Sequence, residues 1–254
     1  MSEQIRLIVH PFGAAEFVID RPERHNAMTL AMYESLLSLI EQCAHDPALR
    51  CILLRGAGGK SFVSGTDIAY FRDFRDGREG VAYEALVERV IDTVERIPVP
   101  TIAVIDGWAV GGGLALATAC DFRVCSTGSR FGAPIAKTLS NTLSSRNIAR
   151  LQAAFGVPRV KKMLLLADYL TAQDALACGY VYEVCAQDAL ESSAYALAQR
   201  LIALSPITQK AVKESLRRIV VEQRLDDEDL IEEVYGSAAF HKAVAAFLSG
   251  SPKG

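Results

Sequence analysis

The pattern of hydrophobic and polar positions changes along the chain. It predicts strands that alternate with helices in the first part of the sequence and mainly helices in the second part. In the first part, short apolar runs alternate with amphipathic stretches of helical periodicity. The separator Pro11-Phe12-Gly13 between the first two runs predicts a hairpin. The runs that predict strands are Ile5–His10, Ala14–Ile19, Cys51–Leu54, Thr101–Ile105 and Phe122–Cys125.

The amphipathic stretches predict helices with identifiable ends. Thr29 can cap a helix that continues to about Cys43. A second helix covers about Val81–Arg96, with its apolar side chains on one face, and Pro98 follows its end. The triple glycine 111–113 opens a third, short and apolar helix.

Beyond Ser140 the pattern is mostly helical, with one short strand at Val181–Val184. From Leu190 to Leu248 every segment has the periodicity of an amphipathic helix. Strands that alternate with helices and then give way to a run of helices predict an α/β fold. We expect a core formed by residues 1–190 and a helical C-terminal part formed by residues 191–254.

Composition and charge exclude several classes of protein. The 254 residues are 50% hydrophobic and 22% charged, which predicts a globular rather than a disordered chain. A net charge of −3 argues against a globally basic protein that binds nucleic acid or a membrane surface. The six cysteines never form C-x-x-C and the four histidines are scattered, so we expect reduced thiols and no metal site.

No segment has the pattern of a secretory signal or of a membrane span. The N-terminus lacks a basic region followed by an apolar one. The longest apolar stretch, Ile97–Cys120, contains two prolines, Asp106 and three consecutive glycines, which would make a poor membrane helix. We therefore expect a cytoplasmic protein.

Two glycine-bearing turns, each after a buried strand, are the candidates for chemistry. The first spans 62–68 and the second spans 106–114, which leads directly into a helix. Glycine allows the backbone to approach a ligand closely, and the first N–H groups of a helix have no partner within the helix. Such amides can stabilise a developing oxyanion, at ~3 kcal/mol for one donor in a dry site.

Nucleotide binding is the alternative interpretation of these glycines, and the sequence supports it weakly. Gly59-Lys60-Ser61 resembles the end of a phosphate-binding loop, but the first glycine of that motif would fall on Leu54. The dinucleotide pattern G-x-G-x-x-G fails after Gly107 because position 109 is Ala109. A purely structural role for the glycines is the remaining alternative.

Several spaced motifs, taken together and in order, resemble the enoyl-CoA hydratase/isomerase (crotonase) superfamily over nearly the whole chain. No single motif would be specific, but their succession is. The motifs are Arg21-Pro22-Glu23, Asn26-Ala27-Met28, Phe62–Ile68, Pro98–Ala117, Cys120–Val124, Arg130–Pro134, Thr171–Gly179 and Ala243–Leu248.

The resemblance implies a crotonase-type spiral of ββα turns with a helical C-terminal trimerisation part, assembled as a homotrimer or hexamer. It implies an acyl-CoA thioester substrate, a place in fatty acid metabolism, and coenzyme A as part of the substrate rather than a prosthetic group. The two oxyanion donors would be the N–H groups of Thr66 and Gly112. The residues expected along the coenzyme A moiety are Arg24, His25, Asn26, Phe62, Ser64, Gly65, Asp67 and Ile68.

Two positions depart from the family pattern. Hydratases of this family use two glutamates to position and deprotonate water, a task that suits one base and one acid. This chain has Ala115 and Ile135 where those glutamates are expected. Hydration by the usual route is therefore not expected.

The segment after Ile135 departs as well, because it is polar and lacks the glycines common in the family. In helical geometry Ser140 and Ser144 would share a face. Other enzymes of this fold place a special polar residue in this region, so we select Ser140 and Asn141 as candidates for contact with the acyl chain. A capping and loop role is the alternative.

The reaction therefore stays open among several outcomes of enolate chemistry. These are atypical hydration or dehydration, double-bond isomerisation, decarboxylation and thioester hydrolysis. Decarboxylation requires least of the side chains, because loss of CO2 itself generates the enolate. A non-catalytic acyl-CoA-binding protein is the contrasting class.

Overall fold

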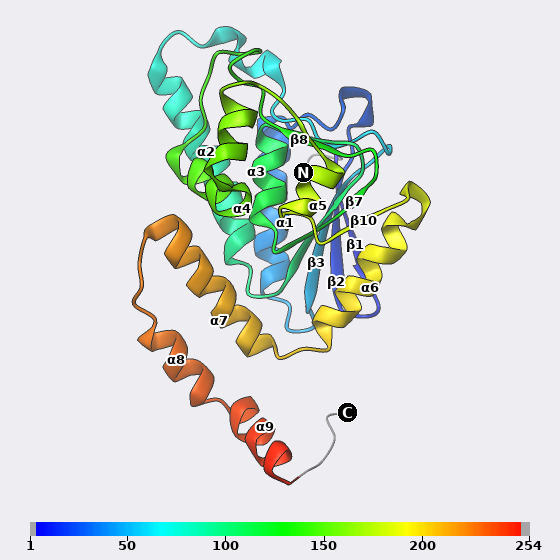
Figure 1. The fold of residues 1–254 in the computed structure, drawn as a ribbon, viewed down its shortest axis with the longest axis vertical. Coiled ribbons are helices and arrows are strands. Elements are labelled where there is room, and N and C mark those ends of the chain that lie inside the picture. Colours follow the sequence, from blue (N-terminus) through cyan, green and yellow to red (C-terminus); the bar gives the residue numbers. More distant parts are fainter. Residues whose placement is uncertain (1–3, 250–254) are drawn as a thin grey trace.

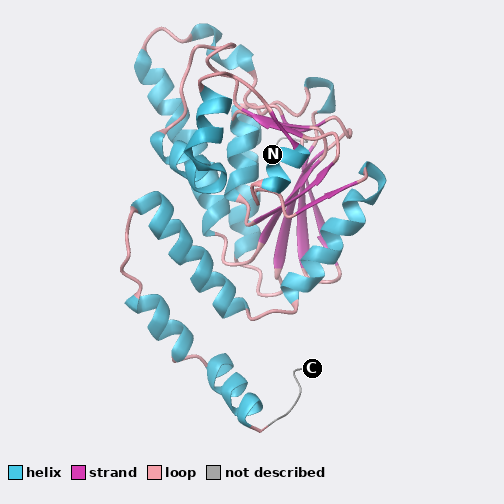
Figure 2. Ribbon diagram, in the orientation of Figure 1, coloured by secondary structure: helices cyan, strands magenta, loops and turns pink. Residues whose placement is uncertain are grey.

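The computed structural model describes residues 4–249, and its described strands form two sheets (Figures 1 and 2). The large sheet has the order β1-β2-β3-β5-β7-β10, with bounds β1 (Ile5–His10), β2 (Ala14–Ile19), β3 (Cys51–Gly56), β5 (Thr101–Ile105), β7 (Phe122–Ser126) and β10 (Glu183–Cys185). The small sheet has the order β4-β6-β8-β9, with bounds β4 (Ser61–Val63), β6 (Trp108–Val110), β8 (Arg130–Gly132) and β9 (Leu170–Thr171).

Helices cover the sheets and form the C-terminal part. The bounds of the α-helices are α1 (Leu30–Ala44), α2 (Gly77–Arg96), α3 (Gly112–Ala119), α4 (Ser145–Leu164), α5 (Ala172–Ala177), α6 (Leu190–Ile202), α7 (Pro206–Arg217), α8 (Glu228–Tyr235) and α9 (Ala238–Leu248). Four short helical turns complete the described chain: η1 (Pro22–Arg24), η2 (Ile68–Asp73), η3 (Gln187–Ala189) and the π-helical η4 (Arg218–Glu222).

Three successive turns of the chain repeat one arrangement. A strand of the large sheet leads to a short strand of the small sheet and then to a helix, as in β3-β4-α2, β5-β6-α3 and β7-β8-α4. The large-sheet strands of these units pair in parallel, and so do the small-sheet strands. This is the predicted spiral of ββα turns. Because the strands of successive turns are parallel neighbours, the spiral places their ends side by side.

Alternate residues of β3 separate the two cores of the protein. Ile52 and Leu54 face the larger core, which α1, α2 and α3 complete. Cys51 and Leu53 face the opposite side of the sheet, where Leu197 and other apolar residues of α6 cover them. Because successive side chains of a strand point to opposite faces, an unbroken apolar run such as Cys51–Leu54 marks a sheet covered on both sides.

Most predicted elements are confirmed, and the differences have local causes. The predicted hairpin, the helix capped by Thr29 and the strand at Thr101–Ile105 are all present. Helix α2 begins four residues before the predicted start, because Asp76 forms a capping box with Glu79. The small sheet was not predicted, because two- and three-residue strands have too few alternating positions to show a pattern.

The segment between β8 and α4 corrects the predicted helical face of Ser140 and Ser144. Residues 135–139 form turns, Ser140 has a positive φ of 53°, and α4 begins only at Ser145. Ser144 is the N-cap of α4, and its hydroxyl accepts a hydrogen bond from the Asn147 amide. The cap therefore starts the helix after the polar segment and leaves that segment as a loop.

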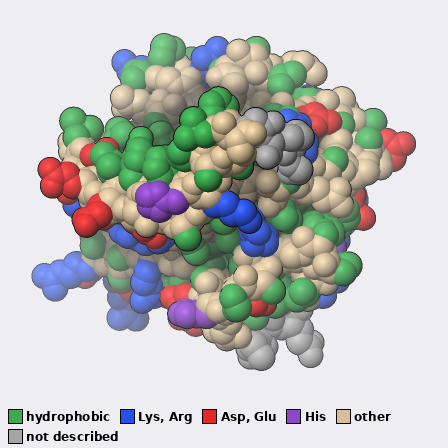
Figure 3. Space-filling view, turned by 90° about the horizontal axis from the view of Figure 1, so that it is seen from below, with side chains coloured by type: hydrophobic (Ala, Val, Ile, Leu, Met, Phe, Trp, Pro, Cys, Tyr) green, Lys and Arg blue, Asp and Glu red, His purple; other side chains and the backbone are tan. Residues whose placement is uncertain are grey.

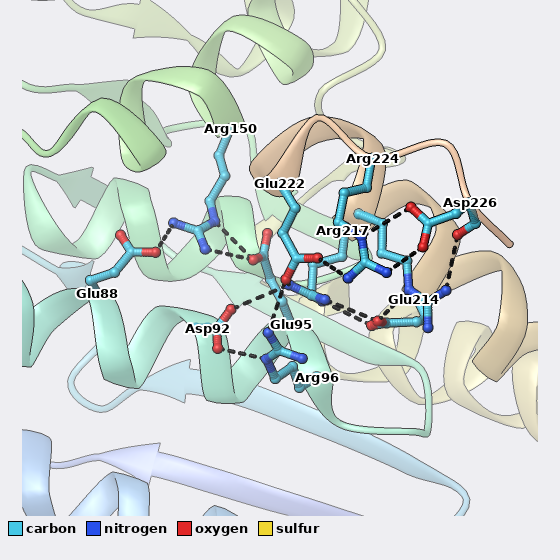
Figure 4. Close-up of polar contacts among 11 residues, drawn as sticks. Glu88, Asp92, Glu95, Arg96, Arg150, Glu214, Arg217, Glu222, Arg224 and Asp226 are labelled. Atoms are coloured by element: carbon cyan, nitrogen blue, oxygen red, sulfur yellow. Dashed lines mark hydrogen bonds and ion pairs between the residues drawn. The ribbon is translucent and has the colours of Figure 1, made fainter. Parts of the chain in front are cut away.

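Helices α7, α8 and α9 form a C-terminal arm, in which α7 lies along the core against α2 and α8 and α9 continue away from it (Figure 1). Charged side chains join the end of α7 to α2, because Glu222 of η4 lies 2.8 Å from Arg217 of α7 and 3.3 Å from Arg96 of α2 (Figure 4). The proposed division at residue 190 stays a prediction, and α6, which follows it, packs on the large sheet. Across residues 4–249, no helix combines the length and apolar character needed to span a membrane.

Candidate functional site

A cavity of about 400 Å³ lies where the two predicted glycine turns meet α2, α3 and the loop before α4. The first turn contributes 64–66 and the second contributes 110–112. The wall from α2 is formed by Tyr83, Glu84 and Val87. The ββα spiral brings these segments together, because β4 and β6 are neighbours in the small sheet and the turn after each strand lies at the same edge.

The two turns approach each other through their glycines. Gly65 has a φ of 106° and Gly111 a φ of 55°, which side-chain-bearing residues rarely adopt. A Cβ atom on Gly65 would lie 3.8 Å from the amide nitrogen of Gly112, and one on Gly111 would lie 3.9 Å from the Cα of Gly65. These distances leave room for a Cβ, so the positive φ is what requires glycine at both positions. A Cβ on Gly113, by contrast, would lie 2.0 Å from the carbonyl oxygen of Val63, so this glycine lets the start of α3 contact the first turn.

The residues on either side of Thr66 form backbone hydrogen bonds with Met28, whereas the amide of Thr66 itself forms none with the described residues. The Met28 amide donates to the Gly65 carbonyl at 2.8 Å, and the Asp67 amide donates to the Met28 carbonyl at 2.9 Å. Because amides alternate in direction along extended chain, the Thr66 N–H points away from Met28. Within the described chain, no backbone acceptor binds it.

The Gly112 amide is unused for a different reason. Gly112 is the first residue of α3, where an N–H group has no acceptor inside the helix. The adjacent Gly111 amide donates to the Gly132 carbonyl at 3.0 Å, and the described residues offer no backbone acceptor to Gly112. Two unpaired donors, Thr66 and Gly112, thus lie in contacting turns that line one cavity.

A chain of hydroxyl groups fixes the first turn to the core. The Thr66 Oγ1 lies 3.0 Å from the hydroxyl of Tyr33 in α1 and 2.6 Å from that of Tyr83 in α2. Burial raises the pKa of Tyr83 to about 12 and raises the pKa of Tyr33 as well. Both phenols are therefore neutral near pH 7, and Thr66 is held from two sides while its amide is left free.

The predicted coenzyme-A contacts divide into residues that reach the cavity and residues that do not. His25, Ser64, Gly65 and Ile68 line it. The remaining four, Arg24, Asn26, Phe62 and Asp67, do not line it.

The structure gives three of the remaining four a fixing role. Phe62 is fully buried in β4. The Asn26 side chain donates to the carbonyls of Ala57 and Ser61 at 2.9 and 2.7 Å and accepts from the Arg21 amide. Asp67 accepts from Arg21 at 2.8 Å, and this hydrogen bond lowers the pKa of the Asp67 carboxyl. These groups set the shape of the loops that end at the cavity.

Comparison with known proteins bears on what this cavity binds. The sequence model of the enoyl-CoA hydratase/isomerase family matches residues 12–250. The chain belongs to the enoyl-CoA hydratase/isomerase family. The match covers both glycine turns and the helical arm.

Curated relatives of this family include hydratases. The chain is 30% identical over 204 residues to the short-chain-enoyl-CoA hydratase of Clostridium acetobutylicum, which covers 80% of this chain and 77% of the relative. It is 30% identical over 199 residues to the crotonyl-CoA hydratase of Syntrophomonas wolfei, with 78% and 76% covered.

A solved structure supports the fold over almost the whole chain. The enoyl-CoA hydratase/carnithine racemase of Magnetospirillum magneticum superposes with a TM-score of 0.88 at 30% identity, covering 98% of this chain and 94% of that one. The crotonase-type α/β fold predicted from the sequence is thereby confirmed.

In this enoyl-CoA hydratase/isomerase family member, the positions without glutamate face the cavity. Ala115 of α3 and Ile135 of the loop after β8 both line it. Asn141 also lines it, whereas Ser140 is exposed and is not among the lining residues. The sequence therefore selected one loop residue that reaches the cavity and one that does not.

Other cavity residues were missed from the sequence. Trp108 is 40% exposed and lines the cavity, in an edge contact with Tyr169 at 5.0 Å between ring centroids. Tyr83 and Glu84 of α2 also line it. In the sequence they belong to a predicted amphipathic helix, in which a glutamate is expected to be a solvent-exposed charge. No sequence motif includes them.

Proposed function

We propose that this chain binds an acyl-CoA thioester in the cavity and stabilises its enolate with the N–H groups of Thr66 and Gly112. The observation that carries the proposal is the pair of unused amides in two contacting glycine turns. A thioester carbonyl becomes an oxyanion when the adjacent carbon loses a proton or CO2. Two preorganised donors stabilise that charge without reorganisation during the reaction.

The apolar wall favours a reaction other than ordinary hydration. Ala115 and Ile135 have no group that could hold a water molecule or transfer a proton. Val87 and Leu143 continue the apolar surface. An apolar acyl group is therefore the preferred occupant. Coenzyme A enters as part of the substrate, and no prosthetic group is needed for enolate formation.

Crotonyl-CoA tests this proposal. We expect binding by calorimetry, because the two unused amides can both donate to the thioester carbonyl. We also expect loss of enone absorbance at least 10³-fold slower than for an ordinary hydratase, because general acid and base catalysis each contribute about 10²–10⁴-fold. Hydration at an ordinary rate would contradict the assigned role of Ala115 and Ile135, and absence of binding would contradict the proposal as a whole.

The proposed assembly is a homotrimer or a hexamer in which copies of the chain cover the helical arm. The arm carries large exposed side chains that its own core does not cover: Leu225, Ile231, Tyr235, Val244, Phe247 and Leu248. Figure 3 shows the molecule from below the view of Figure 1, and hydrophobic side chains gather on the face seen from this side. Contiguous apolar patches on a soluble protein mark interaction surfaces.

A further inference from the structure

One acidic side chain lines the cavity from an element that carries neither of the missing glutamates. Glu84 belongs to α2, whereas Ala115 belongs to α3 and Ile135 to the loop after β8. It is the one carboxylate among the described residues that line the cavity. Its neighbours along the same helix, Tyr83 and Val87, line the cavity with it.

The Glu84 carboxylate is held by one oxygen and has the other available. Its Oε2 accepts a hydrogen bond of 2.8 Å from the backbone amide of Ser144, the N-cap of α4. Within residues 4–249, no hydrogen-bond donor binds Oε1. A carboxylate that is oriented through one oxygen and open through the other has the arrangement required of a general base.

The surroundings of Glu84 favour proton uptake over permanent ionisation. Burial raises the pKa of its carboxyl, the hydrogen bond from the Ser144 amide opposes this, and the negative charge of Glu88, one turn further along α2, adds to the rise. Arg150 of α4 compensates Glu88 through a bond of 2.7 Å and does not bond Glu84. The negative charge of Glu84 in turn helps to raise the pKa of the phenols of Tyr33 and Tyr83, which stay neutral near pH 7.

Three other polar side chains of the cavity wall are worse suited to act as a base. The Tyr83 hydroxyl is engaged by Thr66 and has a pKa of about 12, so it does not serve as a base near pH 7. His25 also lines a neighbouring pocket with Lys60 and Asp106, which places it toward the outside of the cavity. Asn141 has no basic group.

We propose that Glu84 is the proton-transfer residue of this cavity and that the reaction it serves is double-bond isomerisation of an apolar 3-enoyl-CoA to the 2-enoyl-CoA. The inference rests on the proposed function, because the enolate must be held by Thr66 and Gly112. The Glu84 carboxylate takes a proton from carbon 2, and the C–H electron pair moves into the thioester to form the dienolate. The same carboxylic acid then gives a proton to carbon 4, and the double bond moves between carbons 2 and 3. Atoms and charge balance, and no other reactant is consumed.

The test uses 3-butenoyl-CoA as the substrate, with formation of the conjugated product followed by absorbance. We expect wild-type protein to form crotonyl-CoA and, in D2O, to incorporate deuterium. Glu84→Gln keeps the size of the side chain and an oxygen that accepts from Ser144, so the fold is retained. We expect it to lower kcat by at least about 100-fold with KM within about threefold.

Two further variants separate proton transfer from support of the fold. Glu84→Asp keeps the acid but withdraws it by one methylene, so it should retain more activity than Glu84→Gln. Glu88→Gln removes the neighbouring carboxylate, which bonds the Ser144 hydroxyl at 3.1 Å but does not line the cavity. We expect it to lower stability and to move the acid limb of the kcat profile to lower pH, because the pKa of Glu84 falls, while the limiting kcat above that limb stays within about threefold.

The pH profile adds a readout that a structural role would not change. Wild-type kcat should fall at low pH with one ionisation, and this limb should be absent from the residual rate of Glu84→Gln. Equal kcat for wild type and Glu84→Gln, or wild-type protein that binds butyryl-CoA but moves no proton, would overturn the assignment of Glu84 and leave the proposed oxyanion site standing. Absence of butyryl-CoA binding would overturn both.

Discussion

At the scale of single residues, Thr66 contributes two groups with separate tasks. Its amide is a donor proposed for the substrate, and its hydroxyl joins Tyr33 to Tyr83. A buried hydroxyl that loses its partner costs about 1–3 kcal/mol, whereas the amide is a property of the backbone. The two tasks can therefore be separated by substitution.

Thr66→Val should lower the free energy of unfolding by about 1–3 kcal/mol and change thioester affinity by less than about threefold. The reason is that valine removes the hydroxyl between the two phenols and keeps the amide. Urea unfolding and calorimetry measure the two quantities. The double variant Thr66→Val with Tyr33→Phe should cost less than the sum of the single variants, because both lose the same bond. If the losses of unfolding free energy in the two single variants simply added in the double variant, the hydroxyls of Thr66 and Tyr33 would not be coupled.

Glu84→Gln should make the protein more stable than wild type near pH 8, and the difference should vanish in acid. A carboxyl whose pKa is raised by folding contributes stability that is present below its unfolded pKa of about 4.3 and is lost as the pH rises through the folded pKa. Glutamine has no such loss. Urea midpoints between pH 4 and pH 8 measure the difference. If the stability difference between Glu84→Gln and wild type grew as the pH was lowered, the result would contradict a raised pKa of Glu84.

At the scale of elements, α2 is the helix that carries the side chains missed from the sequence into the cavity. Its N-terminus is fixed by a capping box, in which Asp76 accepts from the Arg78 amide at 2.7 Å and Glu79 accepts from the Asp76 amide at 3.1 Å. Further along, Arg150 of α4 bonds Glu88 at 2.7 Å and Glu95 at 2.8 Å (Figure 4). The position of Glu84 therefore depends on polar contacts at both ends of the helix.

Asp76→Ala should lower the free energy of unfolding by about 0.5–2 kcal/mol, because the first turn of α2 loses its side-chain acceptor. Thermal or urea unfolding measures the change. Asp73→Ala is the matched control, since Asp73 is exposed at the end of η2 and caps no helix. Equal stability of the two variants would contradict the capping role of Asp76.

At the scale of the whole molecule, the helical arm needs a cover that residues 4–249 of one copy do not provide. Phe247 and Leu248 are 80% and 79% exposed at the end of α9. Exposure of such side chains in water is unfavourable by about 1.5–3 kcal/mol each relative to burial. Association of several copies removes this cost, and that is the physical reason for the proposed trimer or hexamer.

Combined substitution of Val244→Asp and Phe247→Asp should shift the protein from an oligomer to smaller species, because two charges would have to be buried in the interface. Sedimentation velocity measures the change. Glu41→Lys, an exposed charge change on α1, should leave the sedimentation profile unaltered. Wild-type protein that sediments as a monomer would contradict the proposed assembly.

Local patterns in the sequence determined much of the fold. The apolar, β-rich runs Ile5–His10 and Ala14–Ile19, the cap at Thr29 and the proline after α2 act within a few residues, so they can be predicted without knowing the fold. The glycines at 65 and 111 likewise signal positive φ from their own chemistry.

Only the tertiary structure decided which side chains meet at the cavity. Glu84 and Ser144 are 60 residues apart, and their contact exists because the ββα spiral packs α2 beside the loop before α4. The exclusion of Ser140 depends in the same way on a cap that delays the helix to Ser145. Local patterns result from interactions between near neighbours, whereas a cavity is formed by segments that approach one another only after the chain has folded.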